Sequence, residues 1–235
     1  MSRQRGTGPG RSQLRRSGVG RRQPRRTVTV YCEGSTTERQ YLEMLRGLPA
    51  VRRAVALEIV RPGRHGAGGP QAMVERAVAE RQDRDDQDDE VWCVFDVECP
   101  VQHPSLQQAV ELATRKNIHL AISNPCFEIW LILHLTDHTR WLTNTDAIAL
   151  RAQLDGSTGK EVDAACYGTP ERLAAAIHRA RALAAMHRGN GTTFPADNPS
   201  SGMSELLAAC GLAPPGGVRS GVSRPRPGPP TLPGL

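Results

Sequence analysis

The sequence predicts an α/β fold with a mostly parallel central sheet flanked by helices. Two runs of strand length, residues 27–32 (TVTVYC) and 91–95 (VWCVF), contain almost only apolar and β-branched residues, which is typical of strands covered on both faces. A segment with helical periodicity follows each of them. Strands that alternate with helices imply parallel pairing through right-handed crossovers, so the sheet is expected to be mostly parallel.

The first strand passes through the turn Glu33-Gly34-Ser35-Thr36-Thr37-Glu38 into a helix at 37–47, whose apolar face is formed by Tyr41, Leu42, Leu45 and Leu48. Further strands are expected at 55–60 and 118–122. The helices between the strands are expected at 70–82 and near 104–116.

A helical part follows the last of these strands. The segment CFEIWLILHL after Asn124 is apolar nearly all round, which predicts a buried helix with Pro125 in its first turn. Three more helices are expected at 145–154, 170–186 and 202–210. Together with the strands they form one domain at 27–213.

Charge divides the chain into three parts. Residues 1–26 contain nine Arg and no acid, and residues 214–235 contain three Arg and no acid. Because the whole chain has 30 basic and 24 acidic residues, the segment 27–213 has a formal net charge of −6. Neither tail contains enough apolar surface to pack, so both are expected to be disordered. The Arg-rich tail is either a solvated extension or a sequence-independent contact to phosphate backbones.

The composition favours a cytoplasmic protein. No apolar run is long enough to span a membrane, and no apolar segment of a signal peptide follows the N-terminal charges. The six Cys include no CxxC pair, which argues against a zinc knuckle. Reduced, mostly buried thiols are therefore expected.

Acidic residues follow two of the predicted strands. Glu33 comes after the first strand, and Asp96 and Glu98 come after the strand at 91–95. Carboxyl ends of parallel strands meet at one edge of a sheet, where ligands bind. If the chain leaves the strand in extended geometry, Asp96 and Glu98 point to the same side. Carboxylates at this density suit Mg²⁺ or Mn²⁺.

Such a site would serve phosphodiester chemistry. A metal held by Asp96 and Glu98 would stabilise the charge of an in-line displacement at phosphorus. Glu33 would be either a further ligand or a general acid/base, and the second role requires a raised pKa. In the structural alternative these acids only end strands and cap the helices that follow.

Four segments carry a family resemblance, which covers about residues 27–210. TVTVYCEGSTTERQYLEML, VWCVFDVE, AISNPCFEIWLILHL and DNPSSGMSELL resemble, in this order, segments of the RloB family. SNPCFEIWLILH is the most specific of them. The resemblance implies a TOPRIM-type domain in which Glu33 takes the acid/base position and Asp96 and Glu98 take the two metal positions. It also implies bacterial restriction or antiphage loci and an ATPase partner of the AAA or ABC type. The family usually has Asp where Glu98 stands; Glu keeps the charge and lengthens the side chain by one methylene.

Glu128, Asn124 and the histidines at 134 and 138 each have a structural and a functional interpretation. Glu128 lies in an apolar helix and needs a partner; it is either a fourth acid at the metal site or a structural residue bonded to a backbone N–H or an Arg. Asn124 is interpreted as a turn and cap residue. The i, i+4 pair His134 and His138 lacks the Glu of an HExxH motif, so zinc binding is disfavoured.

Six further positions have ordinary interpretations. His103 would reach phosphate or metal, but a loop His is favoured. Lys160 and Arg64 would contact phosphate, with a solvated charge as the default. Gly66, Gly68 and Gly69 do not form a phosphate-binding GxxxxGK[ST] loop.

The leading hypothesis is therefore a metal-dependent nuclease acting on DNA or RNA in bacterial defence. The alternative is a non-catalytic sensor or regulatory subunit that binds metal or a nucleotide and docks on an ATPase. A third hypothesis is a nucleic-acid-binding module that acts through the Arg-rich tail. The sequence does not choose between DNA and RNA, and a homo-oligomer stays open.

Overall fold

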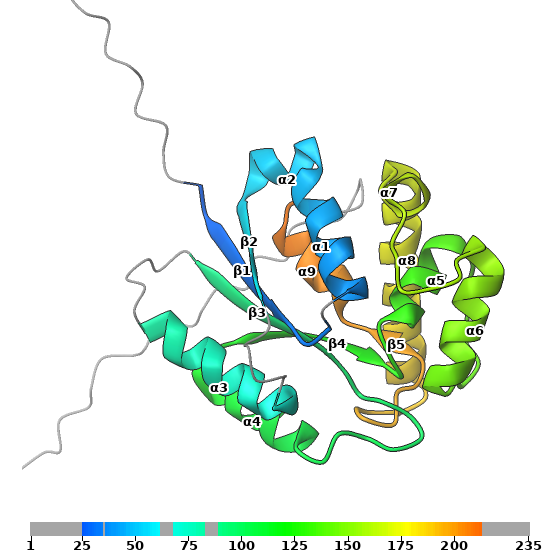
Figure 1. Cartoon of the computed structure of the whole chain (residues 1–235). Helices are drawn as coiled ribbons and strands as arrows, with labels where there is room; N and C mark the ends of the chain where they lie inside the picture. Colours follow the sequence, from blue (N-terminus) through cyan, green and yellow to red (C-terminus); the bar gives the residue numbers. More distant parts are fainter. Residues whose placement is uncertain (1–24, 35, 62–67, 83–88, 213–235) are drawn as a thin grey trace, which may run out of the picture.

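A computed structural model describes residues 25–34, 36–61, 68–82 and 89–212 of the chain (Figure 1). In this part a five-stranded sheet has the order β2-β1-β3-β4-β5. Its strands are β1 (Thr27–Cys32), β2 (Ala56–Val60), β3 (Glu90–Asp96), β4 (His119–Asn124) and β5 (Ser200–Ser201). The first four are parallel, and β5 is antiparallel to β4. The predicted α/β fold with a mostly parallel sheet is confirmed. Arg64, Gly66, residues 1–24 of the N-terminal tail and the whole C-terminal tail 214–235 lie outside the described residues.

The two apolar runs form the centre of the sheet, as expected. Val30 of β1 pairs in register with Trp92 of β3. Along β1, Val28 and Val30 are buried in the core on one face, and Tyr31 is buried in the core on the other. Both faces are covered, which explains why these strands are continuously apolar.

Helices cover both faces of the sheet (Figure 1). On one face lie α1 (Thr37–Gly47), α2 (Pro49–Ala54) and α9 (Met203–Ala209). On the other face, α3 (Gly69–Gln82) and α4 (Leu106–Lys116) pack against each other and bury Val74, Ala77 and Ala109.

The remaining helices stand beside the β5 edge of the sheet (Figure 1). They are α5 (Glu128–Leu135), α6 (Asn144–Asp155), α7 (Ala164–Tyr167) and α8 (Pro170–Gly189). Helix α5 packs against both α6 and α8. Since its residues 129–134 are all buried, the predicted buried helix is confirmed. The helix begins only at Glu128, however, so Pro125 precedes it and does not lie in its first turn.

The sequence patterns did not predict the short elements. Helices α2 and α7 and the two-residue strand β5 were not expected, because segments this short show no periodicity. Pairing of Ser201 with Ser123 and of Ser200 with Asn124 defines β5. Leu48, expected on the apolar face of α1, ends that helix and packs against the core from its C-cap position.

The strand order places a topological switch point at β1. From β1 the chain crosses to β2 on one side, and it then returns to β3 on the other side. The connection from β1 to β2 and the connection from β3 to β4 therefore run in opposite directions from the centre of the sheet, and ligands bind at such a point in open α/β sheets. Glu33 and Asp96 lie at the carboxyl ends of β1 and β3. No helix in the described part is long and apolar enough to cross a membrane.

Candidate functional site

The carboxyl ends of three parallel strands form the floor of the site. The backbone N–H of Glu33 donates to Val94 O at 3.2 Å, which continues the pairing of β1 with β3. Beyond β3, Val97 N donates to Ser123 O at 2.9 Å and Glu98 N donates to Pro125 O at 2.8 Å. These bonds hold the start of α5 beside the end of β3.

Asp96 has a buried carboxylate oxygen at the end of β3. Its Oδ1 atom is buried and has no hydrogen-bond partner among the described residues. Burial raises the pKa of Asp96 well above its ordinary value, and the charges of Glu38, Glu128 and Glu33 raise it further. The Phe127 N–H opposes the shift. A carboxylate in this position needs a positive partner to be ionised at neutral pH.

Glu38 is a site residue that sequence reasoning missed. It lies in the first turn of α1 and is buried. Burial raises its pKa, and the charges of Glu128 and Glu33 add to the shift. A signal was present in the sequence: Glu38 precedes Tyr41, Leu42 and Leu45 at spacings of three, four and seven, so it continues the buried stripe of the helix.

Glu98 does not follow the expected geometry. Its φ of 66° is left-handed, so the backbone at this residue lacks the extended geometry from which a shared direction of Asp96 and Glu98 was predicted. The side chain of Glu98 is 46% exposed, and its Oε1 lies 3.7 Å from His103 Nε2. The backbone bond to Pro125 O fixes this turn.

Glu33 and His103 form the outer pair of the site. His103 Nε2 lies 3.2 Å from Glu33 Oε1, so His103 is in contact with two acids of the site and is not an ordinary loop histidine. Burial raises the pKa of Glu33, the His103 contact lowers it, and the charge of Glu98 raises it. The net shift is upward, in the direction that an acid/base role requires.

Glu128 joins the site from the first position of α5. The residue is partly buried, and its carboxylate interacts with the Cys126 thiol, where it contributes to a strongly raised thiol pKa. Its charge also acts on Asp96 and Glu38. The carboxylate therefore lies near the other acids and is not isolated within an apolar helix.

A comparison with protein-family models matches residues 28–209 to RloB-like protein. The chain belongs to the RloB-like family. The matched range contains Glu33, Asp96, Glu98 and Glu128 as well as Glu38 and His103. No curated protein and no solved structure matches the chain.

The histidine pair at i, i+4 is structural in this RloB-like protein. His134 is buried in an aromatic cluster, where its Nε2 lies 3.1 Å from Tyr41 Oη and its Nδ1 lies 2.8 Å from Trp130 O. His138 lies beyond the end of α5 and interacts with Arg140 O. The two rings therefore have separate partners.

Asn124 has a different structural role from the one expected. It is the last residue of β4. Its Nδ2 donates to Pro195 O at 2.9 Å and to Asp197 Oδ1 at 3.0 Å. The side chain thereby connects the end of β4 to the segment that leads into β5, and it neither caps a helix nor forms a turn.

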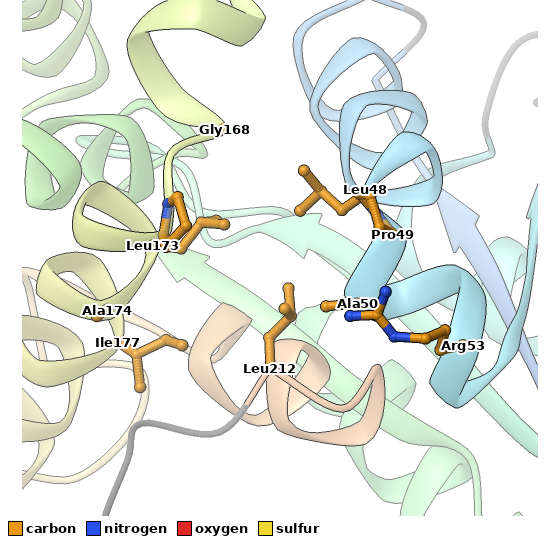
Figure 2. Close-up of a pocket in the computed structure, with 10 residues that line it drawn as sticks. Leu48, Pro49, Ala50, Arg53, Gly168, Leu173, Ala174, Ile177 and Leu212 are labelled. Atoms are coloured by element: carbon orange, nitrogen blue, oxygen red, sulfur yellow. The ribbon is translucent and has the colours of Figure 1, made fainter.

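A separate apolar cavity of about 480 Å³ lies between α2 and α8 (Figure 2). Leu48, Leu173, Ile177 and Leu212 line it, and its described lining contains one charged side chain, Arg53, and no acid. Leu48 is at the opposite end of α1 from Glu38. This cavity therefore has no part in the acidic site.

The acidic residues fit a hard divalent cation by their chemistry. Oxygen ligands from carboxylates suit Mg²⁺ and Mn²⁺, and the unpartnered Oδ1 of Asp96 points to a missing positive partner. Within the described ranges, no three His, Cys, Asp or Glu side chains are already arranged to hold a metal ion. Coordination by these acids would therefore require their side chains to rotate.

Proposed function

We propose that this RloB-like protein is a metal-dependent nuclease that hydrolyses phosphodiester bonds in DNA or RNA. One observation carries the proposal: the buried Oδ1 of Asp96 has no partner although Glu38, Glu128 and Glu33 all place negative charge near it. A concentration of carboxylates at a switch point, with shifted pKa values, marks a functional site better than a structural one.

The residues have distinct roles in the proposed reaction. Asp96, Glu38 and Glu128 would hold a Mg²⁺ or Mn²⁺ ion, with Glu98 as a further ligand if its side chain turns inward. The bound ion supplies charge stabilisation to the phosphoryl oxygens. Glu33 acts as general acid/base, a role that the upward shift of its pKa by burial favours. His103 orients the Glu33 carboxylate through the 3.2 Å contact.

Two substitutions test the nuclease proposal. Glu33→Gln and Asp96→Asn should abolish Mg²⁺-dependent cleavage of single- and double-stranded DNA and RNA and leave the circular dichroism spectrum unchanged. Glu111→Gln is the matched control, since Glu111 is exposed on α4 and contacts only Gln107 in the described part. Cleavage at the wild-type rate in both site variants would refute the proposal.

The family resemblance extends the proposal to biological context. RloB-like proteins are expected in antiphage or restriction loci with an AAA- or ABC-type ATPase, so we place this nuclease beside such a partner. The identity of the neighbouring gene is the direct test. A locus without an ATPase gene would contradict the partnership and leave the nuclease proposal in place.

A second function is favoured by the geometry of Glu98. Its backbone is left-handed and its side chain is half-exposed. A sensor subunit that binds metal or a nucleotide without catalysis would tolerate this geometry. Titration with Mn²⁺ beside the nuclease assay separates the two functions. Stoichiometric Mn²⁺ binding without turnover on any of the nucleic acids would favour the sensor.

A further inference from the structure

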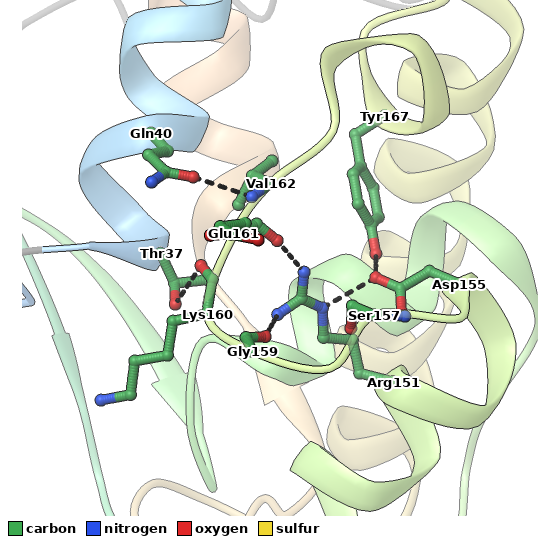
Figure 3. Close-up of polar contacts among 10 residues, drawn as sticks. All are labelled: Thr37, Gln40, Arg151, Asp155, Ser157, Gly159, Lys160, Glu161, Val162 and Tyr167. Carbon is green, nitrogen blue, oxygen red and sulfur yellow. Dashed lines mark hydrogen bonds and ion pairs between the residues drawn. The ribbon is translucent and has the colours of Figure 1, made fainter.

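Lys160 is an unusual residue in this chain. Only two of the 30 basic residues are lysines, Lys116 and Lys160. Lys160 lies in the loop between α6 and α7 and is exposed, and its side chain extends away from the polar network that holds the loop (Figure 3). Its ammonium group forms no ion pair within the described part of the chain.

The backbone on both sides of Lys160 is held by one buried side chain. Arg151 of α6 is 2% exposed. It donates to Gly159 O at 2.9 Å and to Glu161 O, the carbonyls that flank Lys160 (Figure 3). Asp155 accepts from Arg151 Nε at 2.9 Å and also accepts from the Tyr167 hydroxyl. A buried guanidinium with these partners fixes the path of the loop.

Helix α1 holds the same loop from the other side. The Thr37 hydroxyl donates to Lys160 O at 3.1 Å. The backbone N–H of Val162 donates to Gln40 Oε1 at 2.8 Å. Because Thr37 directly precedes Glu38, these bonds attach the lysine to the same helical turn that carries a buried acid of the site.

A cavity lies between this loop and Glu128 of the acidic site. It has a volume of about 290 Å³, and both Lys160 and Glu128 line it. A ligand bound at the acids would therefore extend toward Lys160.

We propose that Lys160 binds a phosphate group of the nucleic-acid substrate beside the acidic site, an inference that rests on the proposed function. The site carries several carboxylates that repel phosphate, so a divalent cation alone leaves excess negative charge when substrate binds. A compact ammonium group on a flexible stem compensates part of that charge. The fixed backbone of the loop limits the motion of the lysine to its side chain.

Labelling with pyridoxal 5′-phosphate tests this inference without cleavage. The aldehyde condenses with a lysine amine to an imine, with loss of water, and borohydride then reduces the imine to a stable amine. Proteolysis and mass spectrometry assign the label in the full-length protein. We expect several-fold more label on Lys160 than on the exposed Lys116, and we expect inorganic phosphate with Mg²⁺ to protect Lys160 alone. Pyridoxal, which lacks the phosphate, should label both lysines similarly.

Equal labelling of the two lysines, or labelling of Lys160 that phosphate does not reduce, would overturn the inference. A kinetic comparison adds a second readout: Lys160→Gln should raise the KM for oligonucleotide cleavage several-fold, and Lys116→Gln should not change it. The two proposals can fail separately. If phosphate protects Lys160 but the protein cleaves no nucleic acid, the nuclease proposal is refuted and the phosphate site stands. If the protein cleaves nucleic acid but phosphate does not protect Lys160, the phosphate site is refuted and the nuclease proposal stands.

Discussion

Gly34 provides the space that the Glu38 carboxylate occupies. A Cβ atom built on Gly34 would overlap both carboxylate oxygens and the carboxyl carbon of Glu38. The residue after Glu33 therefore has to lack a side chain for Glu38 to reach its place near Asp96. The overlap involves the far end of a flexible side chain, so a larger residue at position 34 would displace Glu38 and leave the backbone in place.

Gly34→Ala is therefore expected to weaken metal binding at little cost in stability. Displacing a carboxylate that supports a metal site lowers affinity by roughly 10-fold or more. Isothermal titration with Mn²⁺ and thermal unfolding measure the two effects. Gly47→Ala is the control, because a Cβ at the end of α1 meets nothing within 4 Å. Equal Mn²⁺ affinity in Gly34→Ala and the wild type would show that Glu38 does not support the site.

Asp96→Asn is expected to stabilise the metal-free protein at neutral pH. The pKa of Asp96 is raised in the folded state, so the stability it contributes is fully present below the unfolded pKa and is lost as pH rises through the folded pKa. Asn stays neutral and avoids this loss, which is about 1–3 kcal/mol for a buried unsatisfied group. Urea unfolding at pH 5 and pH 8 should show a gain that is larger at pH 8.

With bound metal, the wild type should become more stable than Asp96→Asn. Mn²⁺ binds the folded wild type and stabilises it by mass action, whereas Asp96→Asn should gain little from the ion. Glu111→Gln should behave as the wild type in both conditions. A destabilised Asp96→Asn variant without metal would mean that the carboxylate has a structural partner.

His134 is expected to make the fold sensitive to acid. Burial lowers its pKa to about 4, and the charges of Arg172 and Arg179 act in the same direction. The unfolded state takes up a proton on His134 near the ordinary pKa of about 6.5, whereas the folded state takes it up only near pH 4. As pH falls through this window, the free energy of unfolding should therefore decrease by about 3 kcal/mol. His134→Gln should unfold with a shallower pH dependence in this window but with lower stability at pH 7, where the contact to Tyr41 changes.

His138→Gln is the control variant for His134→Gln. His138 is less buried than His134, and its ring hydrogen-bonds only to the Arg140 carbonyl in the described part. Its unfolding curves should follow the wild type at every pH. A pH dependence that survives in His134→Gln would assign the acid sensitivity to other groups.

Glu98→Asn is expected to stabilise the fold. A left-handed φ of 66° at Glu98 costs a residue with a long side chain about 1 kcal/mol, and Asn adopts this conformation more readily. Asn117, with a φ of 54°, already occupies such a position at the end of α4. Glu98→Gln keeps the backbone cost and removes only the charge, so it separates the two effects. Thermal unfolding in which Asn is no better than Gln would contradict the backbone explanation.

The sequence by itself determined the order of the main elements and the placement of two acids. Apolar runs of strand length identified β1 and β3, because a strand covered on both faces has a local signature. Parallel order then placed Glu33 and Asp96 at one edge of the sheet, and the family-like segments pointed to the RloB-like family that the comparison confirmed. All of this follows from short-range patterns.

Tertiary structure alone decided which side chains share the site. His103 reaches Glu33 across a loop, and Glu128 reaches the acids because β4 delivers the start of α5 to the end of β3. Lys160 comes near Glu38 through bonds to a helix more than 100 positions away in the chain. Glu98 bonds to Pro125 O through its backbone and lies near His103 through its side chain. No local pattern encodes these contacts, because each depends on how distant segments pack together.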